Sequence, residues 1–329
     1  MSQGQRAFTR RDALKLAGGA ASMAAVGTAL PTVAEAAAPM LGVLRPQVYR
    51  FKLGNFEVTN ILEGFVQNPS LHPTFGSDQP AEAVQALARA NGIPTNFDHH
   101  YVPTLVNTGR ELVLFDTGNP KGRIPTAGKL PELLPLAGYR PEQVDVVVIT
   151  HGHPDHIGGL IDGEGGKPTY PNARYVFGEV EFDFWRKGEN VREARKANLD
   201  LFRKIALPFG ERAAMLKPDG EVVTGIRAVN AYGHSPGMLA FHVESSGQRL
   251  LVWGDVANHY VVSIQQPEWG TGFDDVKDMA IASRKRILDM VATDRIPVAG
   301  FHMPFPSLGW VEKTGTSYRW VPATYQFSL

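Results

Sequence analysis

The chain has no cysteine, no excess of charge of either sign and no long apolar run. Because none of its 329 residues is a cysteine, disulfides, thiolate metal ligands and a cysteine nucleophile are excluded, and any metal site must use nitrogen and oxygen atoms. The 33 basic and 33 acidic residues balance, which leaves no electrostatic basis for binding nucleic acid or an anionic membrane. With 43% hydrophobic residues, the chain can still bury a large core.

The first 36 residues have the features of an export signal. Arg10-Arg11 precedes a run of small and apolar residues from 16 to 31, and Ala34-Glu35-Ala36 matches a cleavage pattern. The arginine pair resembles a twin-arginine signal. The apolar run is short and contains glycine, so we expect no stable membrane span. We therefore expect residues 1–36 to be a signal peptide that the twin-arginine export machinery recognises, residues 37–329 to form the functional domain, and the protein to be periplasmic or extracellular.

Four potential metal ligands lie within one hexapeptide, HGHPDH: His151, His153, Asp155 and His156. The preceding run, 144–150 (VDVVVIT), is rich in β-branched residues and predicts a buried strand, so the motif lies where a strand ends. The intervening glycine and proline allow the sharp turn that brings these side chains together. Imidazole nitrogen and carboxylate oxygen suit zinc and similar first-row ions. A polar turn capped by the aspartate is the alternative, but three histidines in six residues favour a metal site.

Four further residues also follow predicted strands. They are Asp116 in LVLFDTG, His234 in GHSPG, Asp255 in WGD and His302 in GFH. Each of these short motifs is weak alone, because a loop histidine or a capping aspartate is common. Their shared position after strands predicts that they converge at one edge of a folded domain.

Strands and helices alternate through both halves of the chain. Gly54-Asn55 and residues 107–110 separate apolar stretches and predict two hairpins. We expect a surface loop at Asp98-His99-His100-Tyr101, with the entrance to a site as the alternative. The remaining predictions are strands at 144–150, 173–177, 222–229, 239–243, 249–253 and 296–301, and helices at 81–90, 131–136, 179–187, 191–205 and 276–291.

The five motifs, in this order, resemble those of the metallo-β-lactamase-fold hydrolases. The resemblance covers roughly residues 45–325 and implies a mixed α/β (α+β) fold, an αββα sandwich built as a single domain of two half-domains. It also implies two divalent metal ions, zinc in the first place, with manganese, cobalt or iron accepted by the same ligand types. By this resemblance one ion is bound by His151, His153 and His234, the other by Asp155, His156 and His302, and Asp255 bridges them.

The resemblance further implies hydrolysis by a hydroxide that bridges the two ions, because paired dications lower the pKa of a shared water. Asp155 and Asp255 would be the catalytic carboxylates: Asp255 holds both ions, and Asp155 takes and returns a proton. Asp116 is expected to support a ligand histidine rather than bind metal. Trp185 is expected to form a wall of the substrate pocket, although an aromatic residue at helical spacing often lies in a core.

Within the superfamily, the chain resembles the methyl parathion hydrolase group and its lactonase relatives, through residues 137–145 (AGYRPEQVD), 183–185 (DFW) and 315–322 (GTSYRWVP). This group cleaves phosphotriesters or, in related members, lactones and aryl esters. Loop 119–124 (NPKGRI) is polar and basic where the organophosphate enzymes have an aromatic residue. We therefore expect a small-molecule lactone or carboxylic (aryl) ester as substrate, with an organophosphate triester as the alternative.

Two other interpretations remain. A glyoxalase-II-type thioesterase is expected to have a basic helical C-terminal segment, whereas residues 318–329 look extended. A non-catalytic binding protein needs no complete ligand set. Acyl-homoserine lactonases place a tyrosine where this chain has Asn258, with Tyr260 two residues later. Homodimerisation is implied by the family resemblance alone.

Overall fold

Strand β7 (Val146–Ile149) is covered on both of its faces. Val146 and Val148 pack in one buried cluster, whereas Val147 and Ile149 pack in another. Since successive side chains of a strand point to opposite faces, β7 must lie inside a layered structure. The predicted apolar strand before the His-rich motif is therefore confirmed.

The computed structural model describes residues 39–94, 96–163, 166–325 and 327–329, and residues 45–329 form one compact unit. The predicted signal peptide, 1–36, and the predicted start of the domain at residue 37 lie outside the described residues. None of the described helices combines the length and apolarity needed to cross a membrane.

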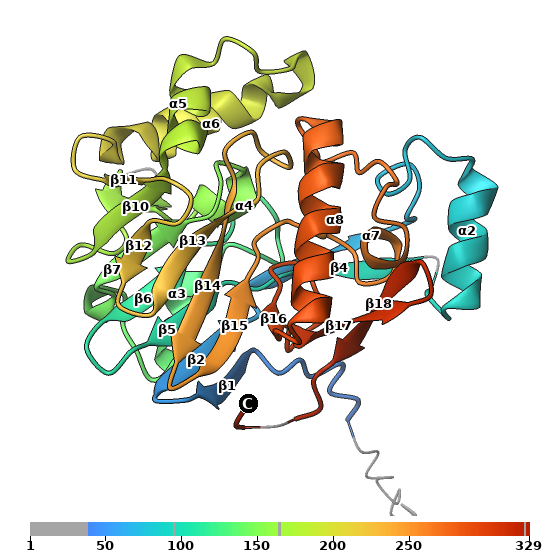
Figure 1. Cartoon of the computed structure of the whole chain (residues 1–329). Helices are drawn as coiled ribbons and strands as arrows, with labels where there is room; N and C mark the ends of the chain where they lie inside the picture. The colour runs from blue at the N-terminus through green and yellow to red at the C-terminus, as the bar shows by residue number, and fades with distance from the viewer. Residues whose placement is uncertain (1–38, 95, 164–165, 326) are drawn as a thin grey trace, which may run out of the picture. The chain divides into compact units, whose positions relative to one another are not determined.

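The described part of the chain forms two seven-stranded sheets (Figure 1). The first has the order β1 (Val48–Leu53), β2 (Phe56–Ile61), β5 (Thr104–Asn107), β6 (Leu112–Phe115), β7, β10 (Arg174–Gly178) and β11 (Ala214–Leu216). The second has the order β12 (Glu221–Val223), β13 (Ile226–Asn230), β14 (Leu239–Ser245), β15 (Gln248–Val252), β16 (Val298–Ala299), β17 (Leu308–Thr314) and β18 (Ser317–Pro322). Two small sheets pair β3 (Gly64–Asn68) with β4 (Phe97–Tyr101) and β8 (Ile161–Asp162) with β9 (Lys167–Pro168).

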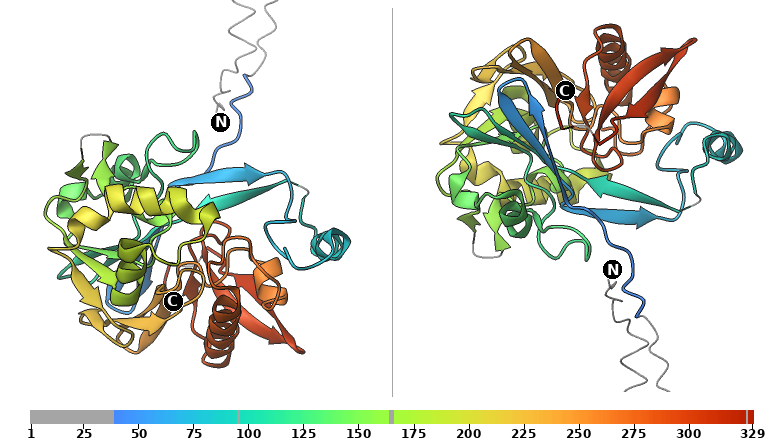
Figure 2. Two further views of the ribbon diagram at one scale, coloured as in Figure 1. Left: turned by 90° about the horizontal axis from the view of Figure 1, so that it is seen from above. Right: turned by 90° about the horizontal axis from the view of Figure 1, so that it is seen from below.

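Helices cover the outer faces of both sheets (Figures 1 and 2). The α-helices are α2 (Ala81–Ala90), α3 (Leu130–Leu133), α4 (Pro154–Ile157), α5 (Glu179–Lys187), α6 (Lys196–Ile205), α7 (Val262–Gln265) and α8 (Lys277–Thr293). Short 3₁₀ turns are η1 (Leu134–Ala137), η2 (Pro141–Gln143), η4 (Glu193–Arg195) and η5 (Leu207–Phe209).

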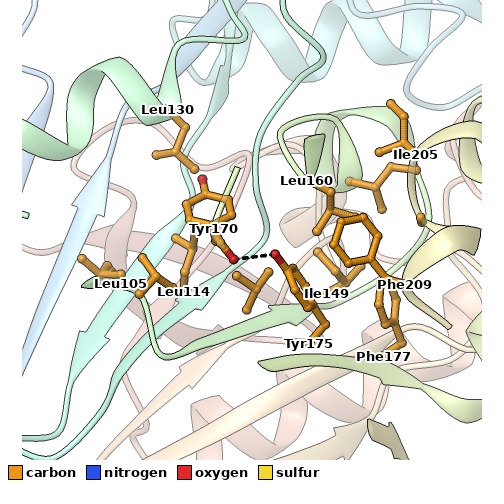
Figure 3. Packing of buried hydrophobic residues seen from close by; sticks show 14 of the residues in the cluster. Leu105, Leu114, Leu130, Ile149, Leu160, Tyr170, Tyr175, Phe177, Ile205 and Phe209 are labelled. Atoms are coloured by element: carbon orange, nitrogen blue, oxygen red, sulfur yellow. Dashed lines mark hydrogen bonds between the residues drawn. The ribbon is translucent and has the colours of Figure 1, made fainter. Parts of the chain in front are cut away.

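Three buried clusters separate the layers. One lies between the first sheet and α3, α5 and α6, the second between the two sheets, and the third between the second sheet and α8. Figure 3 shows the first cluster, where the hydroxyl of Tyr175 donates to the main-chain oxygen of Tyr170 at 2.7 Å. The order helix, sheet, sheet, helix confirms the predicted αββα sandwich.

Two local predictions are wrong. The expected strand 222–229 is divided into β12 and β13, because Gly225 has a φ of 88° and turns the chain between them. The expected surface loop at His99 is strand β4, and His99 itself is 4% exposed. The sequence did not indicate this strand because it contains polar residues. Its burial comes from elements that are distant in sequence.

Candidate active site

Every candidate ligand lies just beyond the end of a strand. His151 and His153 follow β7, and His234 lies between β13 and β14. Asp255 and His302 follow the neighbouring strands β15 and β16, which are parallel to each other. Parallel strands end at the same edge of a sheet, so the loops that follow them converge.

A four-residue helix, α4, carries the other two candidate ligands of the motif, Asp155 and His156. Pro154 is its first residue, where a fixed φ and the missing N–H are tolerated. Asp116 lies beside this helix with a φ of 61°, a strained conformation for a residue other than glycine. Its carboxylate accepts hydrogen bonds from the main-chain N–H and the hydroxyl of Thr150, each at 2.8 Å, and contacts Nδ1 of His156 at 2.7 Å.

The carboxylate of Asp255 lies at the centre of the cluster. Its Oδ2 is 3.2 Å from Nε2 of His234 and 3.0 Å from Nε2 of His302. Its Oδ1 is 3.2 Å from Nε2 of His156. Three groups of side chains each bring ligand atoms within 4.8 Å of one another: His151, His153 and His234; His151, His156 and Asp255; and Asp155, His156 and His302.

Each of the five histidines has one ring nitrogen in contact with an oxygen atom behind it. The opposite nitrogen therefore faces the cluster. The partners are Thr150 Oγ1 for His151 Nδ1 (3.0 Å), Asp275 Oδ2 for His153 Nε2 (2.9 Å), Asp116 Oδ2 for His156 Nδ1 (2.7 Å), Asp274 Oδ1 for His234 Nδ1 (3.0 Å) and the main-chain oxygen of His100 for His302 Nδ1 (2.8 Å). Such oxygen contacts set the tautomer and orientation of metal-binding histidines.

Burial and charge act in opposite directions on these groups. Burial would lower the pKa of His234 and of His302, but the adjacent Asp255 carboxylate raises both to about 9. Burial lowers the pKa of His151 far below its ordinary value, and the neighbouring His156 adds to this effect. The cluster thus concentrates negative charge at Asp255 while keeping at least one imidazole neutral, and a divalent cation satisfies both features.

Three polar atoms of the cluster are buried and have no hydrogen-bond partner among the described residues: Nε2 of His151, Nε2 of His156 and Oδ1 of Asp255. Unpaired buried polar atoms are costly, and each of these faces its neighbours in the cluster. Their nitrogen and oxygen chemistry matches a zinc-type ion. The cluster is therefore suited to divalent metals.

The family model of the metallo-beta-lactamase superfamily matches residues 101–297, more than half of the chain. The chain belongs to this superfamily. It is accordingly a metal-dependent hydrolase by family, and the matched segment contains six of the seven candidate ligands, with His302 just beyond it.

Several members of the superfamily are similar to this chain. An N-acyl homoserine lactonase from Bacillus cereus is 22% identical over 216 residues, which cover 60% of this chain and 78% of the relative. The structure of AidC, described as a dizinc quorum-quenching lactonase, aligns with a TM-score of 0.79 and 24% identity over 85% of this chain and 98% of AidC. AbOPH, described as a hydrolase of the beta lactamase superfamily, also aligns with a TM-score of 0.79 and 24% identity, over 86% of this chain and all of AbOPH. These structural similarities support the fold.

Two carboxylates behind the superfamily motif were missed from the sequence. Asp274 contacts His234, and it also accepts a hydrogen bond at 2.7 Å from Arg284, which is fully buried in α8. Burial acts to raise the pKa of Asp274, but the Arg284 guanidinium lowers it on balance. Asp275 contacts His153. The pair stands as Asp-Asp before α8, a pattern that also fits an ordinary helix start, so the local sequence held no specific signal.

Glu181 in α5 is a third missed residue, and it ties two ligand loops together. Its buried carboxylate accepts hydrogen bonds from the N–H of Gly152 (2.7 Å) and the N–H of Gly237 (2.8 Å). It also accepts from the hydroxyl of Ser235 at 2.5 Å and from Nε1 of Trp185 at 2.7 Å. Gly152 lies between His151 and His153, and Ser235 follows His234, so Glu181 joins the two loops that carry one group of candidate ligands.

Trp185 is not a wall of the substrate pocket. Its side chain is fully buried, its indole N–H bonds Glu181, and it does not line the cavity beside the cluster. Its ring lies behind that of His153, at 5.8 Å between centroids. The prediction was wrong because a helix face rich in aromatic residues packs here into the core between α5, α6 and the first sheet.

A cavity of about 140 Å³ opens beside the cluster. Its lining includes the ligand candidates His153, Asp155, His234, Asp255 and His302, together with Val66, Asn68, His99, Tyr101, Arg123, Pro154, Arg195, Asn198 and Phe273. The alternative that His99 lies at a site entrance is therefore closer to the structure than a surface loop. Its ring packs edge-on against that of His302, at 4.2 Å between centroids.

Asn258, where the resemblance to the lactonases implies a tyrosine, contacts the cluster directly. Its amide donates a hydrogen bond at 2.8 Å to Oδ2 of Asp255. Tyr260 stacks on His259 and does not line the cavity. A tyrosine does reach the cavity from another element, because Tyr101 of β4 lies beside His302, at 5.6 Å between ring centroids.

Proposed function

We propose that the protein is a dinuclear metallohydrolase that cleaves lactones or carboxylic esters, including aryl esters. The observation that carries the proposal is the contact of one nitrogen of every cluster histidine with an oxygen behind it, which leaves the five opposite ring nitrogens facing the cluster around Asp255. The names of its relatives, N-acyl homoserine lactonase and dizinc quorum-quenching lactonase, support this class of substrate.

The proposed ligands follow from the three groups of converging atoms. His151, His153 and His234 would bind one ion, and Asp155, His156 and His302 the other. The two oxygens of Asp255 face different histidines, which suits a carboxylate that bridges. Bound at these residues, zinc or a similar ion would supply Lewis acidity and an activated water.

Side chains that reach the cavity would transfer the proton and bind the substrate oxygens. Asp155 is the more accessible cluster carboxylate, with a side chain 18% exposed against 4% for Asp255, so it can take and return a proton. Burial raises the pKa of the Tyr101 phenol, which therefore remains a hydrogen-bond donor at neutral pH. It can donate to the carbonyl or leaving oxygen of a bound ester. Asn258 keeps Asp255 oriented.

The first test is the metal content of the purified protein. We expect two ions per chain, loss of turnover after chelation and recovery when metal is restored. The control is the His242→Ala variant, which should retain both ions because His242 lies on β14 outside the cluster. A chain that binds no metal would contradict the proposal.

The second test compares kcat/KM for an aryl lactone, an acyl-homoserine lactone, an aryl ester, a thioester and a methyl phosphotriester. We expect the lactones or the carboxylic ester to lead by at least about a hundredfold, equivalent to about 2.7 kcal/mol. A lead for the phosphotriester would replace the proposal with the organophosphate alternative, and a lead for the thioester would favour a glyoxalase-II-type activity. Bound metal without turnover on any substrate would favour a binding protein.

We also propose export by the twin-arginine route, on the strength of the N-terminal sequence alone. Fractionation of expressing cells tests it: the native chain should be found outside the cytoplasm, and a variant with Arg10→Lys and Arg11→Lys should accumulate inside. Equal distribution of the two chains would contradict export by this route. Homodimerisation is a further proposal from the family, which sedimentation would test.

A further inference from the structure

Two arginines, Arg123 and Arg195, line the cavity, and they differ in whether a carboxylate of the protein balances their charge. Nε of Arg195 donates to the Asp275 carboxylate at 2.8 Å, and its terminal nitrogen donates to the main-chain oxygen of Phe273. Its charge is therefore balanced within the protein. Arg123 is exposed, and no described carboxylate forms an ion pair with it. Its one side-chain hydrogen bond among the described residues is to the neutral amide oxygen of Asn119, at 3.1 Å.

The loop that carries Arg123 is held at both ends by one buried carboxylate. Glu63, which is 1% exposed, accepts hydrogen bonds from the main-chain and side-chain N–H groups of Asn119, at 3.0 and 2.9 Å. Its other oxygen accepts from the N–H groups of Gly128 (2.6 Å) and Lys129 (3.2 Å). Loop 119–129 is thus closed at its base, and Asn119 accepts a hydrogen bond from the guanidinium of Arg123, which lines the cavity.

Arg123 shares this cavity with Asp155, Asp255, His302 and Tyr101. A guanidinium that lines the cavity without an internal counter-charge is suited to an anionic oxygen group, which it can bind through two parallel hydrogen bonds. A neutral phosphotriester or a simple alkyl ester offers no such group. The guanidinium of Arg123 in this polar loop therefore indicates a negatively charged substrate.

We propose that the physiological substrate is an ester or lactone that carries an anionic oxygen group, a carboxylate or a phosphate, and that Arg123 binds this group while the scissile carbonyl lies at the Asp255 cluster. The proposal rests on the proposed ester or lactone hydrolysis and specifies the substrate class within it. Arg123 acts as a specificity residue in this arrangement and has no part in the chemical step.

The test uses three aryl esters that differ only at the far end of the acyl chain: 4-nitrophenyl glutarate with a free carboxylate, the neutral 4-nitrophenyl glutaramate, and 4-nitrophenyl 4-phosphonobutyrate. The metal-loaded protein should prefer an anionic ester over the neutral one by about tenfold or more in kcat/KM. Arg123→Gln should abolish this preference. A higher rate for the carboxylate or for the phosphonate identifies which anion is recognised.

Lys121→Gln is the matched control. It removes the same charge from the same loop, but Lys121 pairs with Glu132 at 3.1 Å and does not line the cavity. The control should keep the preference for the anionic ester. No preference in the native protein, or an unchanged preference in Arg123→Gln, would overturn the inference while ester hydrolysis stands.

Calorimetric titration with glutarate separates this inference from the proposed function. If the metal-loaded protein hydrolyses neither these esters nor the lactones tested above, the proposed function fails, and glutarate binding then decides the role of Arg123. We expect Arg123→Gln to bind glutarate about tenfold more weakly than either the native protein or Lys121→Gln. Equal affinities in all three would overturn the role of Arg123.

Discussion

Replacing Glu181 by glutamine should weaken both the fold and the metal cluster. The carboxylate accepts four hydrogen bonds, three at Oε1 and one, from Gly237, at Oε2. A glutamine can keep its carbonyl oxygen at the first position, but its amide group then faces the N–H of Gly237. One buried donor loses its acceptor, at about 1–3 kcal/mol, and the other three bonds lose their charge assistance. We expect the free energy of unfolding to fall by about 2–4 kcal/mol.

Urea unfolding of the metal-free protein and metal analysis after stepwise chelation measure the two effects. The loops of His151 and His234 both bond Glu181, so the variant should release metal at lower chelator concentrations. Glu179→Gln is the matched control: it lies on the same helix, its side chain is 46% exposed, and its pairing with Lys217 at 3.5 Å should contribute less than about 1 kcal/mol. If Glu181→Gln matched this control in stability and metal retention, the reasoning would be refuted.

Three further outcomes are expected. Asp255→Ala should lose at least one ion and nearly all turnover, and retention of both ions would contradict bridging. Trp185→Ala should lower the free energy of unfolding by about 3–5 kcal/mol without changing the ranking of substrates, which kinetics on folded protein would check. In the metal-free protein, the pKa values of His234 and His302, raised to about 9, predict stability that is present below pH 6.5 and declines as pH rises through 9. Denaturation at several pH values measures this slope, and increasing stability over that range would contradict it.

From the sequence alone, the local patterns predicted the main strands, the resemblance to a known family implied the layered fold, and together they located the candidate ligands within it. Strand β7 could be predicted because its apolar β-branched run is local, and the hexapeptide that follows it contains four converging side chains within six residues. Asp116, Asp255 and His302 could be located in the same way, because each follows a strand whose pattern is visible in a few residues.

Only the tertiary structure decided what surrounds the cluster. Asp275 contacts His153 across 122 residues of sequence, and Glu181 contacts Gly237 across 56, so no local pattern reports either contact. Trp185 illustrates the same limit, because an aromatic residue on an amphipathic helix can face a core or a cavity. Which of the two Trp185 faces depends on the layer against which α5 packs. Such polar contacts form between loops that are distant in sequence. These loops meet only when the two sheets have packed against each other.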